Sequence, residues 1–470
     1  MNSIITRFAP SPTGNLHLGS IRTALINYIV AMQSKGRGYE SKFLLRIEDT
    51  DKERSSIEFK NNIIDGLKWL GIVYDEEPVI QSEKIKRHQE IAYSLLSKGK
   101  AFKCICSREY LQKKREENKK NKNNDKKLCK TCEFDKDVQS AESDYVIRIK
   151  NPNDGKIIIK DLVQGNVEVK NKEIDDFVLL RKDGFPTYML SAVVDDYDMG
   201  VNLIIRGDDH LNNSFRQIFV YLNMGWLKPN YAHLPLIHGA DGKKLSKRHG
   251  AVDINDFKDS GYLVESIINN LILLGWSAGK LNEVIEMNEI IKLFNINKIS
   301  KSSSIFNYNK LKFFNNYYIK NDKNFSKFLN YCNDNILFSK FNKLNKEKLL
   351  RIFNVYKKNI NFYKELENIY YVYDDEGYKT NKNKLLDKHF DLLLNEFLSI
   401  IEKINNWEIE DLENIIKNFI LQKKIKFSLF GKPTRLMLIN IENGPSISDI
   451  LYILGKKNSI ERIKNYITNK

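Results

Sequence analysis

The chain has 470 residues, enough for roughly two to four domains, and its 42% hydrophobic and 11% aromatic content excludes a globally disordered protein. Lysine and arginine (76) outnumber aspartate and glutamate (60), and the net charge of +16 favours a polyanionic partner such as RNA, unless it reflects only a coding preference for lysine and asparagine. No secretory signal and no apolar run of about 18 residues occurs, so we expect a cytoplasmic protein that does not span a membrane.

The amino-terminal residues have the pattern of a βαβ unit. Residues 4–8 (IITRF) and 42–48 (KFLLRIE) are short and apolar enough for strands, and residues 21–36 repeat apolar side chains at helical spacing up to a glycine stop. A strand, helix, strand succession implies a parallel sheet. The loop of residues 11–20 (SPTGNLHLGS) follows the first strand, where ligands bind in such sheets.

A second zone of the same kind begins near residue 188. Residues 188–199 and 210–225 have helical spacing, and residues 201–207 (VNLIIRG) between them have the character of a strand. Residues 234–250 (LPLIHGADGKKLSKRHG) then pass from a short apolar stretch into a loop rich in glycine and lysine. The two zones together predict one parallel sheet split between two parts of the chain.

The residues between these zones, 76–187, are predicted to form an insertion. Residues 113–127 (KKREENKKNKNNDKK) predict a charged, low-complexity loop, and several strand-like stretches with alternating side chains follow it. Those stretches are residues 146–150, 156–163 and 166–170. From about residue 254 the spacing turns helical, which predicts an all-α carboxyl-terminal third. The clearest helical stretches are residues 262–276, 349–360, 391–404 and 411–425.

Two glycine-rich loops carry side chains suited to a nucleotide. In residues 11–20, Gly14 and Gly19 let the backbone approach a ligand, the helix start offers free N–H groups, and His17 can donate to phosphate oxygens. Residues 243–248 (KKLSKR) place lysines on a loop that could clamp a triphosphate, although the earlier glycine of a Walker P-loop is missing. Taken alone, each stretch is more often a structural histidine or a solvated lysine cluster.

Together and in this order, the two loops resemble the signatures of the class I aminoacyl-tRNA synthetases. Residues 17–20 (HLGS) are similar to the "HIGH" signature, with Ser20 in place of its second histidine, and residues 244–248 (KLSKR) are similar to the "KMSKS" loop. Six stretches, in order, look like those of the bacterial glutamyl-tRNA synthetase family. They are RFAPSPTGNLHLGSIRTAL, LLRIEDTDKERS, DGFPTYMLSAVVDDYDM, IRGDDHLNN, DGKKLSKRHGA and GYLVESIINNLILLGW.

The resemblance implies a fold and a reaction. The fold is α/β, with a Rossmann-type parallel-sheet catalytic domain split by an α/β insertion and followed by an all-α anticodon-binding region. The reaction is ATP-dependent attachment of L-glutamate to tRNA(Glu) through a glutamyl-adenylate, with Mg²⁺ accompanying ATP and no protein nucleophile. The catalytic candidates are His17, Lys244 and Lys247. The candidate ATP-binding residues are Ser11, Thr13, Gly14, His17, Gly19, Ser20, Lys244, Leu245, Ser246, Lys247 and Arg248.

Selection of glutamate requires cations for the side-chain carboxylate and an anion for the ammonium group. Arg7 and Arg206 lie in two of the predicted strands, near the carboxyl edge of the sheet, where a guanidinium can hold a carboxylate with two hydrogen bonds. Glu48 ends another predicted strand and could accept the ammonium group. The resemblance adds Ser11 and Tyr188 to this glutamate-binding set. Arg7 and Glu48 could instead form a structural ion pair.

Four of the five cysteines lie close together in the insertion. Cys104 and Cys106 form one pair and Cys129 and Cys132 another, which suits a tetrahedral zinc site with thiolate ligands. The first pair has one intervening residue rather than two, so four free thiols are the alternative. The resemblance implies a structural Zn²⁺ in this insertion in some family members, with a variable fourth ligand that we assign to Cys132.

The resemblance also implies a domain order and partners. The expected domains are a Rossmann domain, an inserted domain for the tRNA acceptor stem, a helical stem-contact domain and an anticodon-binding domain. Their expected bounds are residues 1–75 with 188–253, residues 76–187, residues 254–325 and residues 326–470. We expect a monomer that binds no membrane, in which Arg435 and Arg462 meet tRNA phosphates.

Four alternatives share parts of the pattern. A non-discriminating enzyme also glutamylates tRNA(Gln), and the sequence leaves this open. A truncated relative that glutamylates a modified tRNA base lacks an anticodon domain, and a small-molecule nucleotidylyltransferase lacks the long helical end. A catalytically altered tRNA-binding paralogue would be expected to lose His17 or the lysine loop, and both are present.

Overall fold

The computed structural model describes residues 3–51, 54–121, 126–129, 131–245, 253–279, 283–321, 325–334, 344–373, 388–442 and 444–468. It divides into two compact units. Unit 1 is Met1–Phe257 with Ile267–Lys310, and unit 2 is Lys258–Ser266 with Leu311–Lys470. Within the described ranges, no helix combines the length and apolarity needed to cross a bilayer.

Two groups of parallel strands from distant parts of the chain lie at the centre of unit 1 and meet edge to edge, as expected for the predicted split sheet. The strands are β1 (Ile5–Phe8), β2 (Lys42–Ile47), β3 (Val79–Ile80), β9 (Leu203–Gly207) and β10 (Asn230–Leu234). β2 pairs in parallel with β1 and β3, and β9 with β10. The two groups meet where Asn202 N donates to Ile5 O at 3.2 Å and Arg7 Nη1 to Ile205 O at 3.5 Å. The carboxyl ends of β1 and β9 therefore lie at one edge of the sheet.

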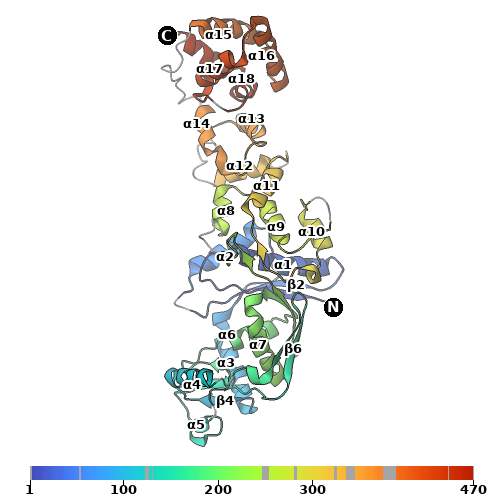
Figure 1. Cartoon of the computed structure of the whole chain (residues 1–470), viewed down its shortest axis with the longest axis vertical. Coiled ribbons are helices and arrows are strands. Elements are labelled where there is room, and N and C mark those ends of the chain that lie inside the picture. Colours follow the sequence, from blue (N-terminus) through green and yellow to red (C-terminus); the bar gives the residue numbers. More distant parts are fainter. Residues whose placement is uncertain are drawn as a thin grey trace. The chain divides into compact units, whose positions relative to one another are not determined.

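Helix α1 (Leu18–Lys35) joins the first two strands and packs against them (Figure 1). His17 caps its amino terminus, and the predicted stop at Gly36 is confirmed. Its buried face includes Leu18, Ile21, Ala24, Leu25 and Ile29, which recur at helical spacing. Thr6 Oγ1 on β1 donates to Asn27 O at 3.0 Å and fixes the helix on the sheet. The loop of residues 11–20 is thereby held at the carboxyl edge of the sheet.

The second zone has the predicted helix, strand, helix order. Helix α6 (Tyr188–Asp198) precedes β9, and the short helix η3 (Asp208–His210) leads into α7 (Leu211–Met224), which ends at Gly225 in the left-handed conformation with φ 73°. Further elements are α2 (Ile57–Trp69), η1 (Gln81–Lys84), η2 (Asn171–Glu173), β11 (Ile237–His238), α10 (Met287–Leu293), η5 (Ile296–Lys298) and β12 (Ser304–Ile305).

The inserted residues contain two kinds of β structure. A three-stranded antiparallel sheet has the order β4–β5–β8, and the hairpin β6–β7 joins the parallel sheet because Asp161 of β6 pairs with Tyr231 of β10. The strands are β4 (Ala101–Cys104), β5 (Val146–Ile149), β6 (Lys156–Asp161), β7 (Gly165–Lys170) and β8 (Val178–Leu180). The helices are α3 (Ile85–Ser97), α4 (Arg108–Lys120) and α5 (Lys136–Ser140). The strands predicted here are confirmed.

The prediction of a loop over residues 113–127 is wrong for residues 113–120, which are helical. Helix α4 runs from Arg108 to Lys120, and residues 122–125 lie outside the described ranges. The segment lacks an apolar stripe, but glutamate, lysine, arginine and glutamine are all strong helix formers. Pairs one turn apart add to this, as where Lys114 Nζ lies 2.9 Å from Glu117 Oε2.

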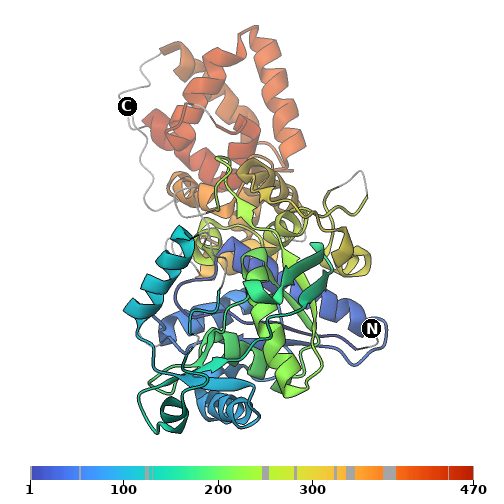
Figure 2. The same ribbon diagram turned by 60° about the horizontal axis from the view of Figure 1, so that its bottom comes forward.

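Unit 2 is helical, as predicted for the carboxyl-terminal third. Its helices are α12 (Phe325–Asp334), α13 (Lys346–Tyr356), η8 (Tyr363–Ile369), α14 (Tyr370–Tyr373), α15 (Lys388–Ile401), α16 (Ile409–Lys423), α17 (Phe427–Ile439) and α18 (Ile447–Thr468). Helices α8 (Ile254–Ser260), α9 (Val264–Ile272) and α11 (Tyr308–Ile319) contain residues of both units. The ribbons of α15 to α18 lie together in Figure 2, around a core that includes Phe397, Phe419 and Phe430.

The prediction that Arg462 meets a tRNA phosphate is wrong. Arg462 is only 6% exposed, and its Nη1 donates to Val372 O at 2.8 Å and to Leu438 O at 2.6 Å. A guanidinium that binds backbone carbonyls inside the core cannot reach a tRNA phosphate. Arg435 is half-buried and its Nε donates to Pro445 O at 2.9 Å. Cys332 is fully buried in unit 2.

Candidate active site

A cavity of about 790 Å³ opens in unit 1 at the carboxyl ends of β1 and β9. Those two strands belong to the two separate zones of the sheet, and a crevice at such a point is the usual ligand site of an open α/β sheet. All described members of the predicted ATP and glutamate sets line it. They are Arg7, Ser11, Thr13, Gly14, His17, Gly19, Ser20, Glu48, Tyr188, Arg206, Lys244 and Leu245. Ser246, Lys247 and Arg248 lie outside the described residues.

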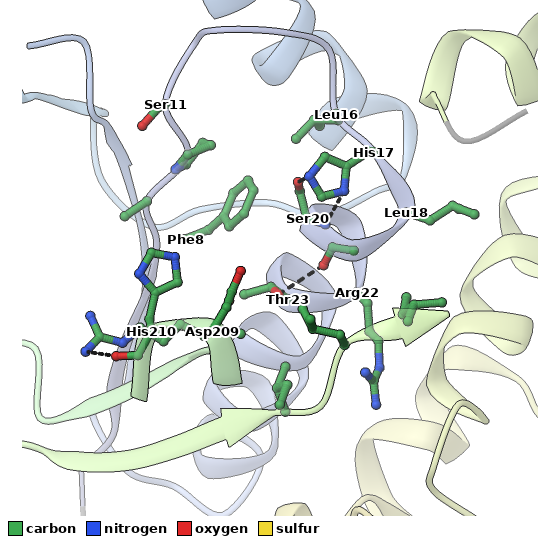
Figure 3. Close-up of a pocket in the computed structure, with 18 of the residues that line it drawn as sticks. Phe8, Ser11, Leu16, His17, Leu18, Ser20, Arg22, Thr23, Asp209 and His210 are labelled. Carbon is green, nitrogen blue, oxygen red and sulfur yellow. Dashed lines mark hydrogen bonds between the residues drawn. The ribbon is translucent and has the colours of Figure 1, made fainter. Parts of the chain in front are cut away.

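His17 lies on the cavity wall at the start of α1 (Figure 3). Its Nδ1 accepts a hydrogen bond from Ser20 N at 3.3 Å, so its Nε2 carries the proton and donates to Ser20 Oγ at 2.9 Å. Gly19 makes room for the ring, because a Cβ there would lie 3.1 Å from His17 Cε1. Burial, together with the nearby charge of Lys244, lowers the pKa of His17. The imidazole is therefore neutral at pH 7 and offers an N–H donor.

Lys244 enters the same cavity from the second loop. Its backbone bridges to His238 of β11, and Leu245 N donates to Ile237 O at 2.9 Å, so the first part of the loop is fixed to a strand. Lys244 Nζ lies 3.4 Å from Asp209 Oδ2, and both side chains are largely exposed. Lys244 and His17 both line the cavity. The two loops that the sequence singled out thus face one hollow.

Arg206 supplies a positive charge to the cavity. Its Nη1 donates to Tyr188 Oη at 3.0 Å, and its Nη2 donates to Ser214 Oγ at 2.6 Å and to Gln217 Oε1 at 2.8 Å. Its Nε donates to His233 Nε2 at 3.3 Å. All these partners are uncharged acceptors, and within the described residues Arg206 has no ion pair within 4.0 Å. Its charge is therefore available to an anionic ligand.

Arg7 is held by a buried ion-pair network. Its Nε lies 2.9 Å from Asp196 Oδ1, while Arg46 contacts the same Asp196 oxygen at 2.6 Å and Glu48 Oε1 at 3.0 Å. Arg7 and Glu48 thus pair with Asp196 and Arg46 rather than with each other. Burial would raise the pKa of Asp196, but the charges of Arg46 and Arg7 lower it overall. Burial raises the pKa of Glu48, and Arg46 offsets part of that effect.

Two titratable residues of the cavity wall, Asp209 and His210, were not among the predicted ones. Both belong to η3, just after β9, and they line the cavity opposite the loop of residues 11–20 (Figure 3). Burial and the charge of Arg206 lower the pKa of His210, so this ring is also neutral at pH 7. Their position immediately after a predicted strand was the available signal, because side chains at that edge face the ligand site.

The four inserted cysteines come together at the end of β4 and in the segment after α4. Their sulfur atoms all lie within 4.8 Å of one another, and three of the six separations are 3.5–3.6 Å. Sulfur atoms about 2.3 Å from a tetrahedral zinc ion lie about 3.8 Å apart, so this set fits Zn²⁺. Cys104, Cys129 and Cys132 are buried, Cys106 is partly exposed, and none forms a disulfide. The chemistry and spacing of the four sulfurs thus suit a structural zinc ion.

Comparisons with known proteins cover the whole chain. A family model described as "tRNA synthetases class I (E and Q), catalytic domain" matches residues 3–313, and one described as "Anticodon binding domain" matches residues 323–467. Glutamate–tRNA ligase 1 of Rickettsia canadensis is 41% identical over 99% of this chain and 100% of the relative. Glutamate–tRNA ligase 2 of Zymomonas mobilis is 39% identical over 99% of this chain and 97% of the relative. A crystal structure of a glutamate tRNA ligase from Elizabethkingia meningosepticum in complex with its amino acid has a TM-score of 0.82 and 29% identity, and the match covers 99% of each chain.

The split parallel sheet, the cavity shared by the two loops and these matches define a class of protein. The chain belongs to the class I tRNA synthetases. Within that class it falls in the branch for glutamate and glutamine (E and Q), with an anticodon binding domain after the catalytic domain.

Proposed function

We propose that the protein attaches L-glutamate to tRNA(Glu) in an ATP-dependent reaction, as an aminoacyl-tRNA synthetase. The names of its relatives over the full chain length support this substrate. The observation that carries the proposal is that one cavity is lined by the loop of residues 11–20, by Lys244 and by the two arginines Arg7 and Arg206. Such a cavity can hold a nucleotide and a dicarboxylic amino acid side by side.

In the first step, the α-carboxylate of glutamate attacks the α-phosphorus of ATP, and pyrophosphate leaves. The protein aligns the reactants and stabilises charge, and it supplies no nucleophile. We assign to His17 a hydrogen bond from its neutral Nε2–H, which would leave Ser20 Oγ, to a phosphate oxygen, and to Lys244 and Lys247 the neutralisation of the leaving pyrophosphate. Ser11, Thr13, Gly14, Gly19, Ser20, Leu245, Ser246 and Arg248 complete the proposed ATP site, and Mg²⁺ would accompany the nucleotide. In the second step, a hydroxyl of the terminal tRNA ribose attacks the acyl carbon and AMP leaves.

Glutamate selection is assigned to the side of the cavity formed by β1, β9 and α6. Arg206 and Arg7 hold the side-chain carboxylate, Tyr188 and Ser11 contact the amino acid, and Glu48 accepts the ammonium group. The uncompensated charge of Arg206 supports this assignment, since the neutral amide of glutamine would leave that buried charge without a counter-ion.

Pyrophosphate exchange tests the reaction directly. With purified protein, ATP and tRNA, we expect exchange with glutamate and none above background with glutamine. The resemblance to glutamyl-tRNA synthetases implies that glutamate activation needs bound tRNA. We therefore also expect exchange to require tRNA, and equal exchange without it would refute that coupling. A protein that binds tRNA but gives no exchange with glutamate would instead be the catalytically altered paralogue.

The remaining partners follow from the same proposal. We propose that Cys104, Cys106, Cys129 and Cys132 hold a structural Zn²⁺ that braces the inserted residues. We keep the four-domain division given above, with residues 76–187 on the acceptor stem and residues 326–470 on the anticodon, in a monomeric, cytoplasmic enzyme. Whether tRNA(Gln) is a second substrate is decided by charging assays on the two purified tRNAs.

A further inference from the structure

A buried histidine–aspartate pair lies directly behind Arg206, on the neighbouring strand. His233 on β10 is opposite Arg206 on β9 in the strand register. Its Nδ1 lies 2.6 Å from Asp161 Oδ2, at the end of β6, and neither side chain is exposed to solvent. The three residues come from three strands of one sheet, and Asp161 and His233 do not line the cavity.

The partners of His233 fix its tautomer. Arg206 has only N–H donors, so His233 Nε2 must be an acceptor of the 3.3 Å bond from Arg206 Nε. Ser214 Oγ accepts from Arg206 Nη2 at 2.6 Å and is free to donate its own proton to His233 Nε2 at 3.0 Å. The Nδ1 therefore carries the proton and donates to Asp161. Burial lowers the pKa of His233, and the charge of Arg206 adds to that effect, so the ring stays neutral.

We propose that Asp161 and His233 are positioning residues for Arg206, which keep the Nε side of its guanidinium bound and so direct its Nη1 into the amino-acid site. The proposal rests on the function proposed above, in which Arg206 holds the side-chain carboxylate. Without an acceptor on the Nε side, the guanidinium of Arg206 would lose one of its fixed hydrogen bonds and could turn within the site. Since carboxylate recognition by arginine depends on the direction of its N–H groups, the affinity for the amino acid should follow.

Asp161→Asn separates this role from general support of the fold. Asp161 Oδ1 accepts Val163 N at 2.9 Å, Gln164 N at 2.8 Å and His233 N at 3.1 Å, and an asparagine oxygen can keep these bonds. Its Nδ2 would then replace Oδ2 and donate to His233 Nδ1. The proton of His233 would move to Nε2. Two N–H groups would then face each other, and His233 could no longer accept the hydrogen bond from Arg206 Nε.

The test measures tRNA glutamylation by the full chain. For Asp161→Asn we expect the KM for glutamate to rise about tenfold, the scale for a buried donor left without its acceptor, while kcat and the KM for ATP change less than about twofold. His233→Asn can keep a donor for Asp161 Oδ2 but places no acceptor at Arg206 Nε, so it should raise the KM for glutamate by a similar factor and carries the test if Asp161→Asn does not fold. The matched control is Asp176→Asn, which alters a half-buried carboxyl of the inserted residues away from Arg206 and should leave all three parameters unchanged.

The outcomes are distinct. An unchanged KM for glutamate in folded Asp161→Asn overturns the proposal. A parallel change in kcat and in the KM for ATP also overturns it, because that pattern shows a pair that merely joins β6 to β10. A wild-type protein that does not charge tRNA with glutamate refutes the proposed function itself, and this is seen before any variant is compared.

Discussion

Gly19 illustrates how one absent side chain shapes the candidate site. The imidazole of His17 lies across it, and an added Cβ would approach His17 Cε1 to 3.1 Å and His17 Nδ1 to 3.2 Å. Contacts that short require the ring to shift by a few tenths of an ångström, which would weaken the 3.3 Å hydrogen bond from Ser20 N to His17 Nδ1. The position thus requires glycine for contact reasons, since its backbone is not in the left-handed region.

We therefore expect Gly19→Ala to lower the rate of pyrophosphate exchange by roughly ten- to a hundredfold, because the displaced histidine no longer meets the phosphate. The melting temperature should change little. Gly36→Ala, at the other end of the same helix, is the control, since a Cβ there meets its nearest atom at an ordinary 3.4 Å. An exchange rate for Gly19→Ala equal to that of the control would show that the ring accommodates the methyl group, and that this position does not require glycine.

Asp196 joins Arg7 and Arg46 through a single oxygen, and its ionisation contributes to stability. Its pKa is lowered in the folded protein, so its contribution is present above its ordinary pKa of 3.8 and is lost as the pH falls through the folded value. We expect Asp196→Asn to reduce the free energy of unfolding at pH 7 by about 3–5 kcal/mol, because two buried guanidinium groups lose their common partner. Urea unfolding at pH 7 and at about pH 3, below the ordinary pKa of the carboxyl group, measures both effects. Glu168→Gln, which alters an exposed ion pair with Lys156, should change little.

At the scale of elements, β4 and α4 depend on the cysteine cluster. Its sulfur atoms belong to the core cluster that also contains Phe102, Leu111 and Val138. We expect about one zinc ion per chain by metal analysis, and a loss of that zinc with a lower melting temperature in Cys132→Ser. Cys332→Ala, which removes the distant core thiol, should retain the metal. A purified wild-type chain with no bound zinc would end the proposal.

Elements whose apolar residues repeat strictly could be predicted from the sequence. β1, α1 and β2 were found because each buries one face or both, and burial imposes its period on the side chains. Helix α4 was missed because it exposes most of its side chains, so no apolar period marks it. Its Lys- and Glu-rich composition was the overlooked signal.

Only some residues of the candidate site could be predicted from the sequence. Residues next to strand ends, such as Arg7 and Glu48, could be proposed from the sequence because the edge of a parallel sheet gathers them. The partners of those residues could not. Asp196 reaches Arg7 across 189 positions, and Asp161 reaches His233 across 72. Such contacts depend on strand order and register, which no local pattern encodes.

At the scale of the whole molecule, each unit has a hydrophobic core of its own. ATP is proposed to bind only in the cavity of unit 1, and a ligand raises the stability of the unit that binds it. We expect calorimetry to resolve more than one unfolding transition. Saturating ATP should raise the midpoint temperature of one transition and leave that of another unchanged. A single transition that moves as a whole would show that the two units unfold cooperatively.

The split sheet also has a consequence for synthesis on the ribosome. Ile5 bonds to Asn202, 197 positions further along the chain, so one edge of β1 has no neighbour until the nascent polypeptide has grown past that point. An unpaired strand edge is a template for aggregation, and distant pairings form slowly because a long loop must first close. The inserted residues lie between these partners and emerge first. A growing chain that carries them but not β9 is therefore the stage at which a chaperone would be needed most.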